Sequence, residues 1–328
     1  MITRAKWWVT AFAGLFELLS ACSAVSHPPV VQAKTVGQAD YTVVDVMPRF
    51  WRFVDQSAGK DSAESRRLFH EIVVAEDSAV FSGFSGGPSD ATLGRWLRDV
   101  QPYLAATRRL DARLATELPL YRASFMRVFP DARWDNTSVY FMPWFFISDA
   151  GVGQLPDGRQ ILVFGVDDIA RYRGPESNLA TVFHHELFHL YHARAHPEWA
   201  GAGRGPLYRA VWGEGLAEYV GEVLNPAASL EDVVGAETVR GTQPRVASLA
   251  KEIREQLDST SSRINRDYMS ASPIRKDLPP RSGYYVGLLV ARRLSKQHSL
   301  AELVRLRDPE LRVDIERALR DIEADKKP

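Results

Sequence analysis

The sequence contains a single cysteine, Cys22, among its 328 residues, which excludes an intramolecular disulfide framework. Basic and acidic side chains balance at 41 each, so no net charge draws the chain to nucleic acid or to an anionic membrane surface. Internal repeats and low-complexity tracts are absent, and no segment after residue 25 is long and apolar enough to span a bilayer. With 45% hydrophobic residues the chain is typical of a globular protein, built as one large domain or two closely packed lobes.

The first residues have the pattern of an export signal. Arg4 and Lys6 precede the apolar run 7–19, which is too short for a stable transmembrane helix. The run ends in the letters LSAC, which resemble the lipobox of bacterial lipoproteins, where the cysteine carries the lipid. The resemblance implies a lipoprotein signal peptide over residues 1–21 and lipidation of Cys22. An ordinary secretory signal with an incidental cysteine is the alternative.

The predicted location follows from this anchor. Ser23, and not an aspartate, follows Cys22. By resemblance to Gram-negative lipoproteins this implies a protein of the cell envelope, lipid-anchored to the outer membrane and facing the periplasm. Residues 22–40 have no hydrophobic periodicity and are predicted to be a flexible tether.

Beyond the tether the sequence predicts an α+β fold. From residue 41 to 130 the pattern is mostly helical, with a helix start at Asp61 and with Pro102 and Pro119 separating the segments. We interpret residues 41–130 as a helical lobe and residues 131–328 as the domain that carries the chemistry.

The second domain begins with two runs that are rich in β-branched and aromatic residues, 138–148 and 160–166. Glycines and a Pro-Asp-Gly turn lie between them, so we expect a hairpin or two adjacent strands. Capping residues and prolines predict helices over about 178–196, 207–225, 247–257, 281–295 and 309–324.

The main chemical signal is an HExxH motif, which occupies residues 185–189 inside one of these predicted helices. A spacing of four places His185 and His189 on one helix face, where both imidazoles can bind one zinc ion. Glu186 lies one position round the helix and can reach a water in the open coordination position, so it is predicted to be the general base.

A catalytic zinc of this kind needs a third protein ligand. His192 continues the same helix face, but three ligands on one straight helix converge poorly on a tetrahedron. His196 lies one position beyond the third histidine of the metzincin pattern, which also has a glycine where His192 stands, so both histidines are expected to be surface or supporting residues. The carboxylates of Glu214 and Glu218, on the next predicted helix, are the stronger candidates.

An HExxH motif followed by W-x-E-G-x-A-E-Y over residues 212–219 resembles the gluzincin metallopeptidases, in particular an uncharacterised group of predicted zinc-dependent proteases. The resemblance implies that Glu214 is the third ligand and that Glu218 supports a ligating histidine. There are two alternatives. Glu218 is the ligand in place of Glu214, or Glu214, Glu218 and Glu222 form an exposed acidic stripe on the helix. It also implies a thermolysin-like fold, a small mixed sheet above two metal-bearing helices, and we expect residues 160–167 to be the edge strand that holds substrate.

A weaker motif, G-Y-x-x-G at residues 283–287, resembles an element of the same group of proteases. Gluzincins commonly use a tyrosine or histidine beyond the metal helices to stabilise the oxyanion, and Tyr284 has that position here. Tyr285 and Arg281 are the next candidates. The alternative is that both tyrosines are packing residues at the start of a helix.

These features predict a zinc metallopeptidase of the gluzincin type that acts on peptides or proteins, touches the membrane through its lipid anchor and does not bind nucleic acid. The resemblance implies that zinc polarises the scissile carbonyl and acidifies the attacking water. Peptide deformylases use HExxH with a cysteine ligand, and the one cysteine here lies in the predicted signal. A non-catalytic zinc-binding envelope lipoprotein that binds a partner, and a hydrolase of a non-peptide amide, are the rival hypotheses.

Overall fold

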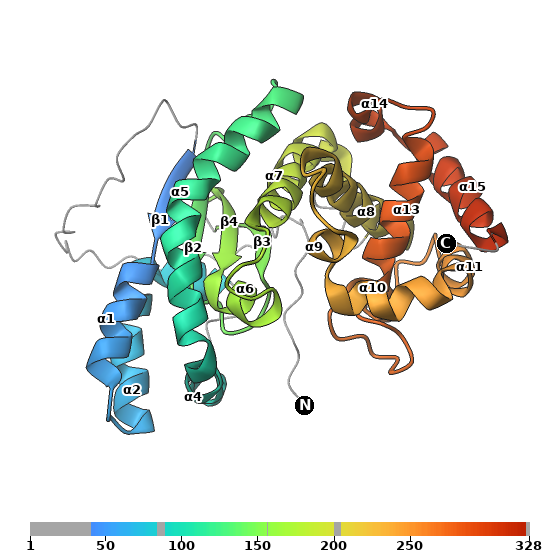
Figure 1. The fold of residues 1–328 in the computed structure, drawn as a ribbon. Helices are drawn as coiled ribbons and strands as arrows, with labels where there is room; N and C mark the ends of the chain where they lie inside the picture. Colours follow the sequence, from blue (N-terminus) through green and yellow to red (C-terminus); the bar gives the residue numbers. More distant parts are fainter. Residues whose placement is uncertain (1–40, 84–88, 156, 200–204, 326–328) are drawn as a thin grey trace, which may run out of the picture.

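The computed structural model describes residues 41–83, 89–155, 157–199 and 205–325 (Figure 1). The predicted signal peptide, Cys22 and the tether lie outside these residues. Within the described ranges, no helix has the length and hydrophobicity needed to cross a membrane.

A small mixed sheet forms the centre of one half of the molecule (Figure 1). Its strand order is β1-β2-β4-β3. Strands β1 (Tyr41–Asp45), β2 (Thr137–Met142) and β4 (Gln160–Gly165) run parallel, and β3 (Ala150–Gln154) pairs antiparallel with β4. Helices make up most of the rest, so the prediction of an α+β fold with a small mixed sheet is confirmed.

The sheet differs from the sequence prediction in three ways. Residues 41–45 form β1, so the segment 41–130 is not wholly helical and it contributes a strand to the sheet of the following domain. Of the two alternatives for the next two runs, adjacent strands are confirmed, but β2 and β4 are parallel, which rules out a hairpin between them. The edge-strand prediction for residues 160–167 is wrong, because β4 lies inside the sheet and β3 forms the edge. Gly151 and Gly153 give β3 a low strand propensity, and the pattern there was that of a turn.

The helices that precede strand β2 along the chain form the N-terminal lobe. They are α1 (Met47–Ser57), α2 (Ser62–Phe69), α3 (Ser78–Gly83), α4 (Asp90–Asp99) and α5 (Leu104–Val128). Asp61 begins α2 as predicted, because its carboxylate accepts hydrogen bonds from the amides of Ala63 and Glu64 at 2.9 Å. Pro119 does not end a segment, contrary to the prediction; it lies inside α5.

An aromatic cluster joins this lobe to the sheet half of the molecule. Phe69 and Trp96, from α2 and α4, pack against Phe145 with ring centroids 5.7 and 5.1 Å apart from it. Asp167 on α6 (Val166–Tyr172) accepts hydrogen bonds from the Trp96 indole at 2.8 Å and from the Trp144 amide at 2.6 Å. The lobe therefore holds the turn that leads into the edge strand β3.

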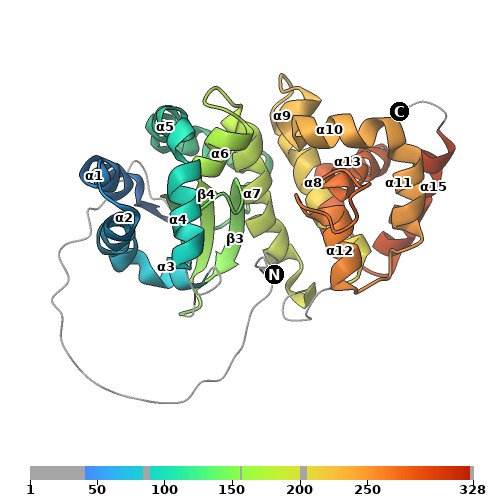
Figure 2. The same ribbon diagram turned by 90° about the horizontal axis from the view of Figure 1, so that it is seen from below.

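Two helices carry the predicted metal ligands, and both have their predicted bounds within two residues. Helix α7 (Leu179–Ala195) follows Asn178 and ends before Pro197, and α8 (Leu207–Leu224) lies between Pro206 and Pro226. Figure 2 shows α7 beside the sheet and α8 in the other half of the molecule. The two halves meet where these helices pack together.

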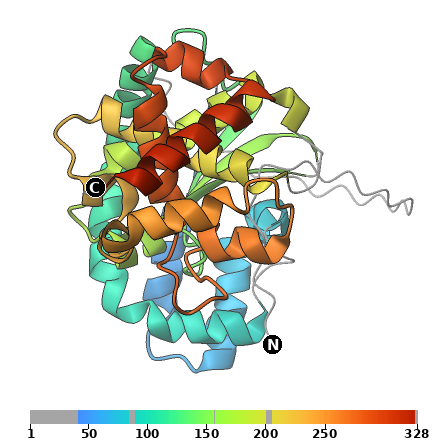
Figure 3. The same cartoon turned by 90° about the vertical axis from the view of Figure 1, so that its right-hand side faces the viewer.

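In the described residues from 205 to 325, the second half consists of helices and the loops between them. Besides α8 it contains α9 (Leu230–Val234), α10 (Ala236–Thr242), α11 (Val246–Arg254), α12 (Ser262–Met269), α13 (Ser282–Leu294), α14 (Leu300–Arg305) and α15 (Glu310–Ala324). The predicted helices at 247–257, 281–295 and 309–324 correspond to α11, α13 and α15. Figure 3 shows the last of these, in dark red, crossing the outside of this half.

The glycines of the two sequence motifs meet where α8 crosses α13. A β-carbon on Gly215 would overlap the backbone of Gly287, and one on Gly287 would lie 2.8 Å from the Gly215 α-carbon. The crossing is therefore a backbone contact that only glycine permits. Because Gly215 follows Glu214 and Gly287 lies one turn after Tyr284, this contact fixes the spacing between those two side chains.

Replacement of Gly215 by alanine is expected to destabilise the protein by about 1–3 kcal/mol or more, because neither backbone can yield without moving a helix. Gly213 provides a matched control, since a β-carbon there meets nothing within 4 Å. Gly213→Ala should be neutral or more stable by up to about 1 kcal/mol. Urea unfolding of both variants without metal measures the difference, and equal stabilities would contradict the close helix crossing.

Candidate metal centre

Helix α7 carries two histidines one turn apart in its buried middle. Asn178 fixes its first turn, because the side-chain oxygen accepts a hydrogen bond from the Ala180 amide at 3.2 Å. His185 and His189 lie on one face of the helix, with their Nε2 atoms 2.9 Å apart. The two side chains are mostly buried, with exposed fractions of 12% and 16%. Both imidazoles therefore present a nitrogen to the same point.

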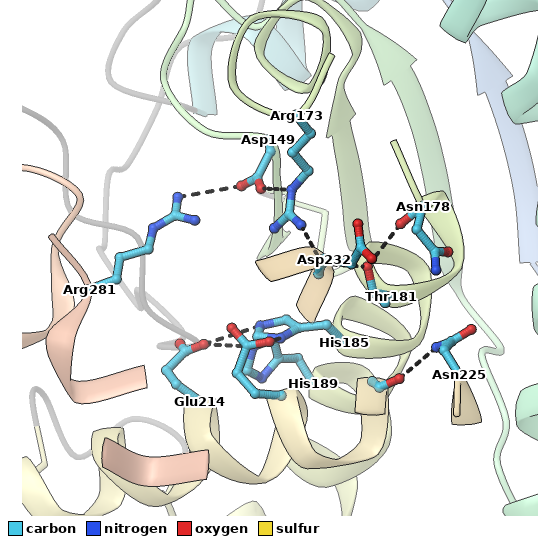
Figure 4. A network of polar contacts seen from close by, with 12 residues as sticks. Asp149, Arg173, Asn178, Thr181, His185, His189, Glu214, Asn225, Asp232 and Arg281 are labelled. Atoms are coloured by element: carbon cyan, nitrogen blue, oxygen red, sulfur yellow. Dashed lines mark hydrogen bonds and ion pairs between the residues drawn. The ribbon is translucent and has the colours of Figure 1, made fainter. Parts of the chain in front are cut away.

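Glu214 on α8 completes a triangle of donor atoms (Figure 4). Its Oε2 atom lies 3.1 Å from Nε2 of His189 and 3.3 Å from Nε2 of His185. Ligands at about 2.0–2.1 Å around a tetrahedral zinc ion are separated from one another by about 3.3 Å. Among the described residues these three side chains form a group that could hold a metal ion. Their spacing fits three corners of a zinc tetrahedron.

The charges at this point favour a cation. Burial by itself lowers the pKa of His185, but Glu218 and Glu214 more than offset it and hold that pKa well above its ordinary value. Burial likewise raises the pKa of Glu214, and the two histidines outweigh it and hold that pKa well below its ordinary range. The carboxylate of Glu214 therefore stays ionised, as a zinc ligand must be, and zinc would displace the proton that these carboxylates hold on His185.

Glu218 lies behind the first histidine. Its Oε2 atom is 3.4 Å from Nδ1 of His185, the ring nitrogen opposite the one that faces Glu214. A carboxylate in this place fixes the tautomer of a ligating histidine and raises its basicity. Glu222, one turn further along α8, pairs with Arg292 instead. The three glutamates are therefore not an exposed stripe, since Glu218 is only 5% exposed.

Glu186 is buried and lines the same cavity as the three ligands. Burial raises the pKa of its carboxyl above the ordinary value, although His185 and His189 oppose this shift. A raised pKa makes a carboxylate a better proton acceptor near neutral pH.

The ligands open into a cavity of about 270 Å³ between the two halves of the molecule. One wall is the stretch Ser148–Val152, which includes the start of the edge strand β3. Residues from α7, α8 and the start of α13 form most of the remaining walls, together with residues of the connecting loops and single residues of α9 and α12. The candidate metal site is therefore accessible from a space large enough for a short peptide segment.

The three candidates for the oxyanion donor, Tyr284, Tyr285 and Arg281, differ in whether they line the cavity. Tyr284 lines the cavity, and its ring lies parallel to that of His185 with centroids 6.2 Å apart. Burial raises the pKa of its hydroxyl well above the ordinary value, so it keeps its proton and remains a donor. Tyr285 is only 3% exposed and belongs to the hydrophobic core. Arg281 lines the cavity beside Tyr284.

His192 and His196, which were expected to be surface or supporting residues, do not lie at the surface, so the surface alternative is wrong. His192 and His196 are 5% and 2% exposed. His196 Nε2 lies 2.8 Å from the Val304 carbonyl and the ring stacks on Trp199, which ties the end of α7 to the C-terminal helices. His192 is stacked on Phe188 with centroids 5.2 Å apart.

Sequence reasoning missed a charged cluster beside the candidate metal site. Asp149, just before β3, accepts a hydrogen bond from Arg173 Nε at 2.9 Å and pairs with Arg281 at 3.4 Å (Figure 4). Burial raises the pKa of Asp149, but the two arginines outweigh it and hold the pKa well below its ordinary range. The sequence named Arg281 only as a possible oxyanion donor, and no local pattern marks Asp149 or Arg173, because the three residues come from separate segments.

Comparisons with protein-family models, with curated proteins and with solved structures find no match for this chain.

Proposed function

We propose that the chain is a zinc-dependent peptidase of the gluzincin type with a thermolysin-like arrangement of its site. The observation that carries the proposal is the triangle of His185, His189 and Glu214, which opens into a cavity that Glu186 also lines. Three protein ligands with a free fourth corner are typical of catalytic zinc, whereas structural zinc has four. Zinc, when bound there, would act as a Lewis acid toward the scissile carbonyl and lower the pKa of water.

The chain's own residues supply the proton chemistry. Glu186 accepts the proton of the attacking water and passes it to the leaving amine. Glu218 holds His185 in the tautomer that leaves Nε2 free for the metal. No covalent intermediate with the protein is needed.

The edge strand β3 is the proposed binding surface for the substrate backbone. Ala150, Gly151 and Val152 line the cavity, and among the described residues β3 pairs with β4 alone. A strand with a free edge can add an extended peptide through main-chain hydrogen bonds. This arrangement supports a peptide substrate over a small non-peptide amide, which would not use the strand.

Replacement of Tyr284 by phenylalanine is expected to lower kcat by roughly 10²-fold, because the hydroxyl is proposed to donate a hydrogen bond to the carbonyl oxygen as negative charge develops on it. KM and zinc content should change little, since the hydroxyl is not needed to bind either. Tyr285→Phe is the matched control. A Tyr284→Phe protein with the wild-type kcat would return this residue to a packing role and make Arg281 the donor to test.

Cleavage of a peptide library by the zinc-reconstituted protein tests the proposed function. The rival hypothesis, a non-catalytic zinc-binding lipoprotein, predicts stoichiometric zinc and no cleavage of any peptide. The free fourth corner and the cavity beside Glu186 favour the enzyme.

We also propose that the protein is anchored to the cell envelope by lipid on Cys22, which lies outside the described residues. Cys22→Ser should abolish labelling by fatty acid and leave the precursor uncleaved, because the lipoprotein pathway modifies that thiol. Fractionation and mass spectrometry of the expressed full chain measure both. Recovery of the wild-type chain as a soluble periplasmic protein without lipid would contradict the anchor.

A further inference from the structure

The charged cluster at the cavity wall has more positive than negative groups. Two guanidinium groups, Arg173 and Arg281, share the single carboxylate of Asp149. Asp168 lies nearby, but burial and its acidic neighbours Asp167 and Asp149 raise its pKa to about 8, so at neutral pH it is mainly uncharged. Within the cluster the two guanidinium groups therefore share one ionised carboxylate, and the next acidic neighbour of Arg281 is Glu218 of the candidate metal site.

Arg281 uses fewer of its N–H donors within the cluster than Arg173 does. A guanidinium group has five N–H donors. In the described part of the chain its side chain has one ion-pair contact, to Asp149 Oδ1 at 3.4 Å, which is long for a hydrogen bond. Arg173, in contrast, donates to Asp149 at 2.9 Å and to the Asp232 carbonyl at 3.1 Å. Figure 4 shows the two arginines approaching Asp149 from opposite sides.

The backbone at Arg281 provides an independent observation. Its φ of 50° lies in the left-handed region, which residues with a β-carbon rarely adopt. Such strained positions cluster at functional sites, where the surrounding structure holds them in place. Arg281 is fixed there by its amide, which donates to the Ser270 carbonyl at 2.9 Å, and its side chain is 27% exposed at the cavity.

From this geometry we infer that Arg281, held by Asp149 and Arg173, is a carboxylate-binding subsite beside the metal centre, so that the enzyme favours peptides with a carboxylate next to the scissile bond. The carboxylate comes either from an aspartate or glutamate side chain or from the free C-terminus of the substrate. A planar guanidinium binds such a group through two parallel hydrogen bonds.

This inference rests on the proposed function. The glutamates of the centre, Glu186, Glu214 and Glu218, would repel an anionic group if no divalent cation offset them. It deepens that function by naming the substrate class.

Three peptides that share one cleavable sequence test the inference. One is neutral and amidated, the second has glutamate in place of glutamine beside the bond, and the third ends in a free carboxylate beside the bond. We expect kcat/KM for one of the two charged peptides to exceed that of the neutral peptide by about 10- to 100-fold, as for a charge-assisted hydrogen bond. The charged peptide with the higher kcat/KM shows whether the subsite binds a side-chain carboxylate or a C-terminal one.

Replacement of Arg281 by glutamine should reduce that ratio to about one, whereas Arg281→Lys should retain part of it because the charge remains. Arg209→Gln is the matched control, since Arg209 also lines the cavity but pairs with Asp308, and its ratio should stay at the wild-type value. Equilibrium binding of the same peptides to the zinc-loaded Glu186→Gln protein gives a readout without turnover.

Two results would overturn the subsite. Cleavage of all three peptides at equal rates contradicts the preference itself and leaves the peptidase intact. A preference that survives in Arg281→Gln means that the metal or another group takes the carboxylate. Cleavage of none of them is a different outcome, because it contradicts the proposed function; the binding measurement then decides the subsite on its own.

Discussion

Replacement of Glu186 by glutamine is expected to lower kcat for peptide cleavage by about 10²- to 10⁴-fold while zinc content stays near one ion per chain. Glutamine has nearly the same shape but cannot accept the proton of the attacking water. The donor atoms of His185, His189 and Glu214 already form the triangle that fits zinc, and Glu186 is not part of it. This variant should therefore lose most of its activity and keep its metal content.

Steady-state kinetics and metal analysis on the same preparation measure both quantities. Glu222→Gln is a suitable control, because Glu222 lies on α8 as Glu214 does but pairs with Arg292 away from the ligands. A Glu186→Gln protein that has lost its zinc would mean that this residue is a ligand. One that keeps the wild-type kcat would remove it from the mechanism.

Replacement of Glu214 by glutamine is expected to weaken zinc binding more than replacement of Glu218 does. Glu214 Oε2 lies within 3.3 Å of both histidine Nε2 atoms, whereas Glu218 reaches only the far nitrogen of His185 at 3.4 Å. Loss of a supporting carboxylate typically costs about 10- to 100-fold in metal affinity, and loss of a direct ligand should exceed this. Glutamine keeps the volume of each side chain, so packing changes little.

Competition with a chelator of known affinity measures the two zinc dissociation constants. The reverse order, with Glu218→Gln the weaker binder, would make Glu218 the ligand and Glu214 its support. Equal and small losses in both would mean that neither carboxylate coordinates the metal. The free energy of unfolding of the metal-free variants shows whether either change also disturbs the packing of α7 against α8.

Local signals explain why the grouping of the candidate metal ligands could be predicted from the sequence. Asn178 begins α7, and prolines bound α8, so the two helices can be placed without knowing what they contact. Once α7 is a helix, a spacing of four brings His185 and His189 to one face. The choice between Glu214 and Glu218 depends on how α8 packs against α7, and there the sequence left an alternative.

Long-range pairing explains what the sequence did not reveal. Strand β3 contains Gly151 and Gly153 and has little intrinsic strand preference, so only its pairing with β4 makes it a strand. Strand β1 likewise depends on β2, which follows the whole N-terminal lobe. The contact between Asp149 and Arg281 joins residues 132 positions apart. Hydrophobic periodicity, with a period of 3.6 residues in helices and two in strands, depends on neighbouring residues and cannot predict such long-range contacts.

Gly215 and Gly287 are a second case in which the sequence alone does not show what a residue does. Both Gly215 and Gly287 lie in motifs that the sequence marks as important, and each reads locally as a poor helix former. Their purpose is visible only when α8 and α13 cross, because each glycine admits the backbone of the other helix. The two motifs are therefore one structural unit that sets Glu214 and Tyr284 around the same cavity.

The zinc content of the purified wild-type protein tests the central claim most directly. After reconstitution with zinc at neutral pH and removal of excess metal, we expect one ion per chain in the wild type and none in His185→Ala. The triangle of His185, His189 and Glu214 predicts this result, since each supplies one donor atom at the spacing zinc requires. A folded wild-type protein that remains metal-free under these conditions would contradict the account.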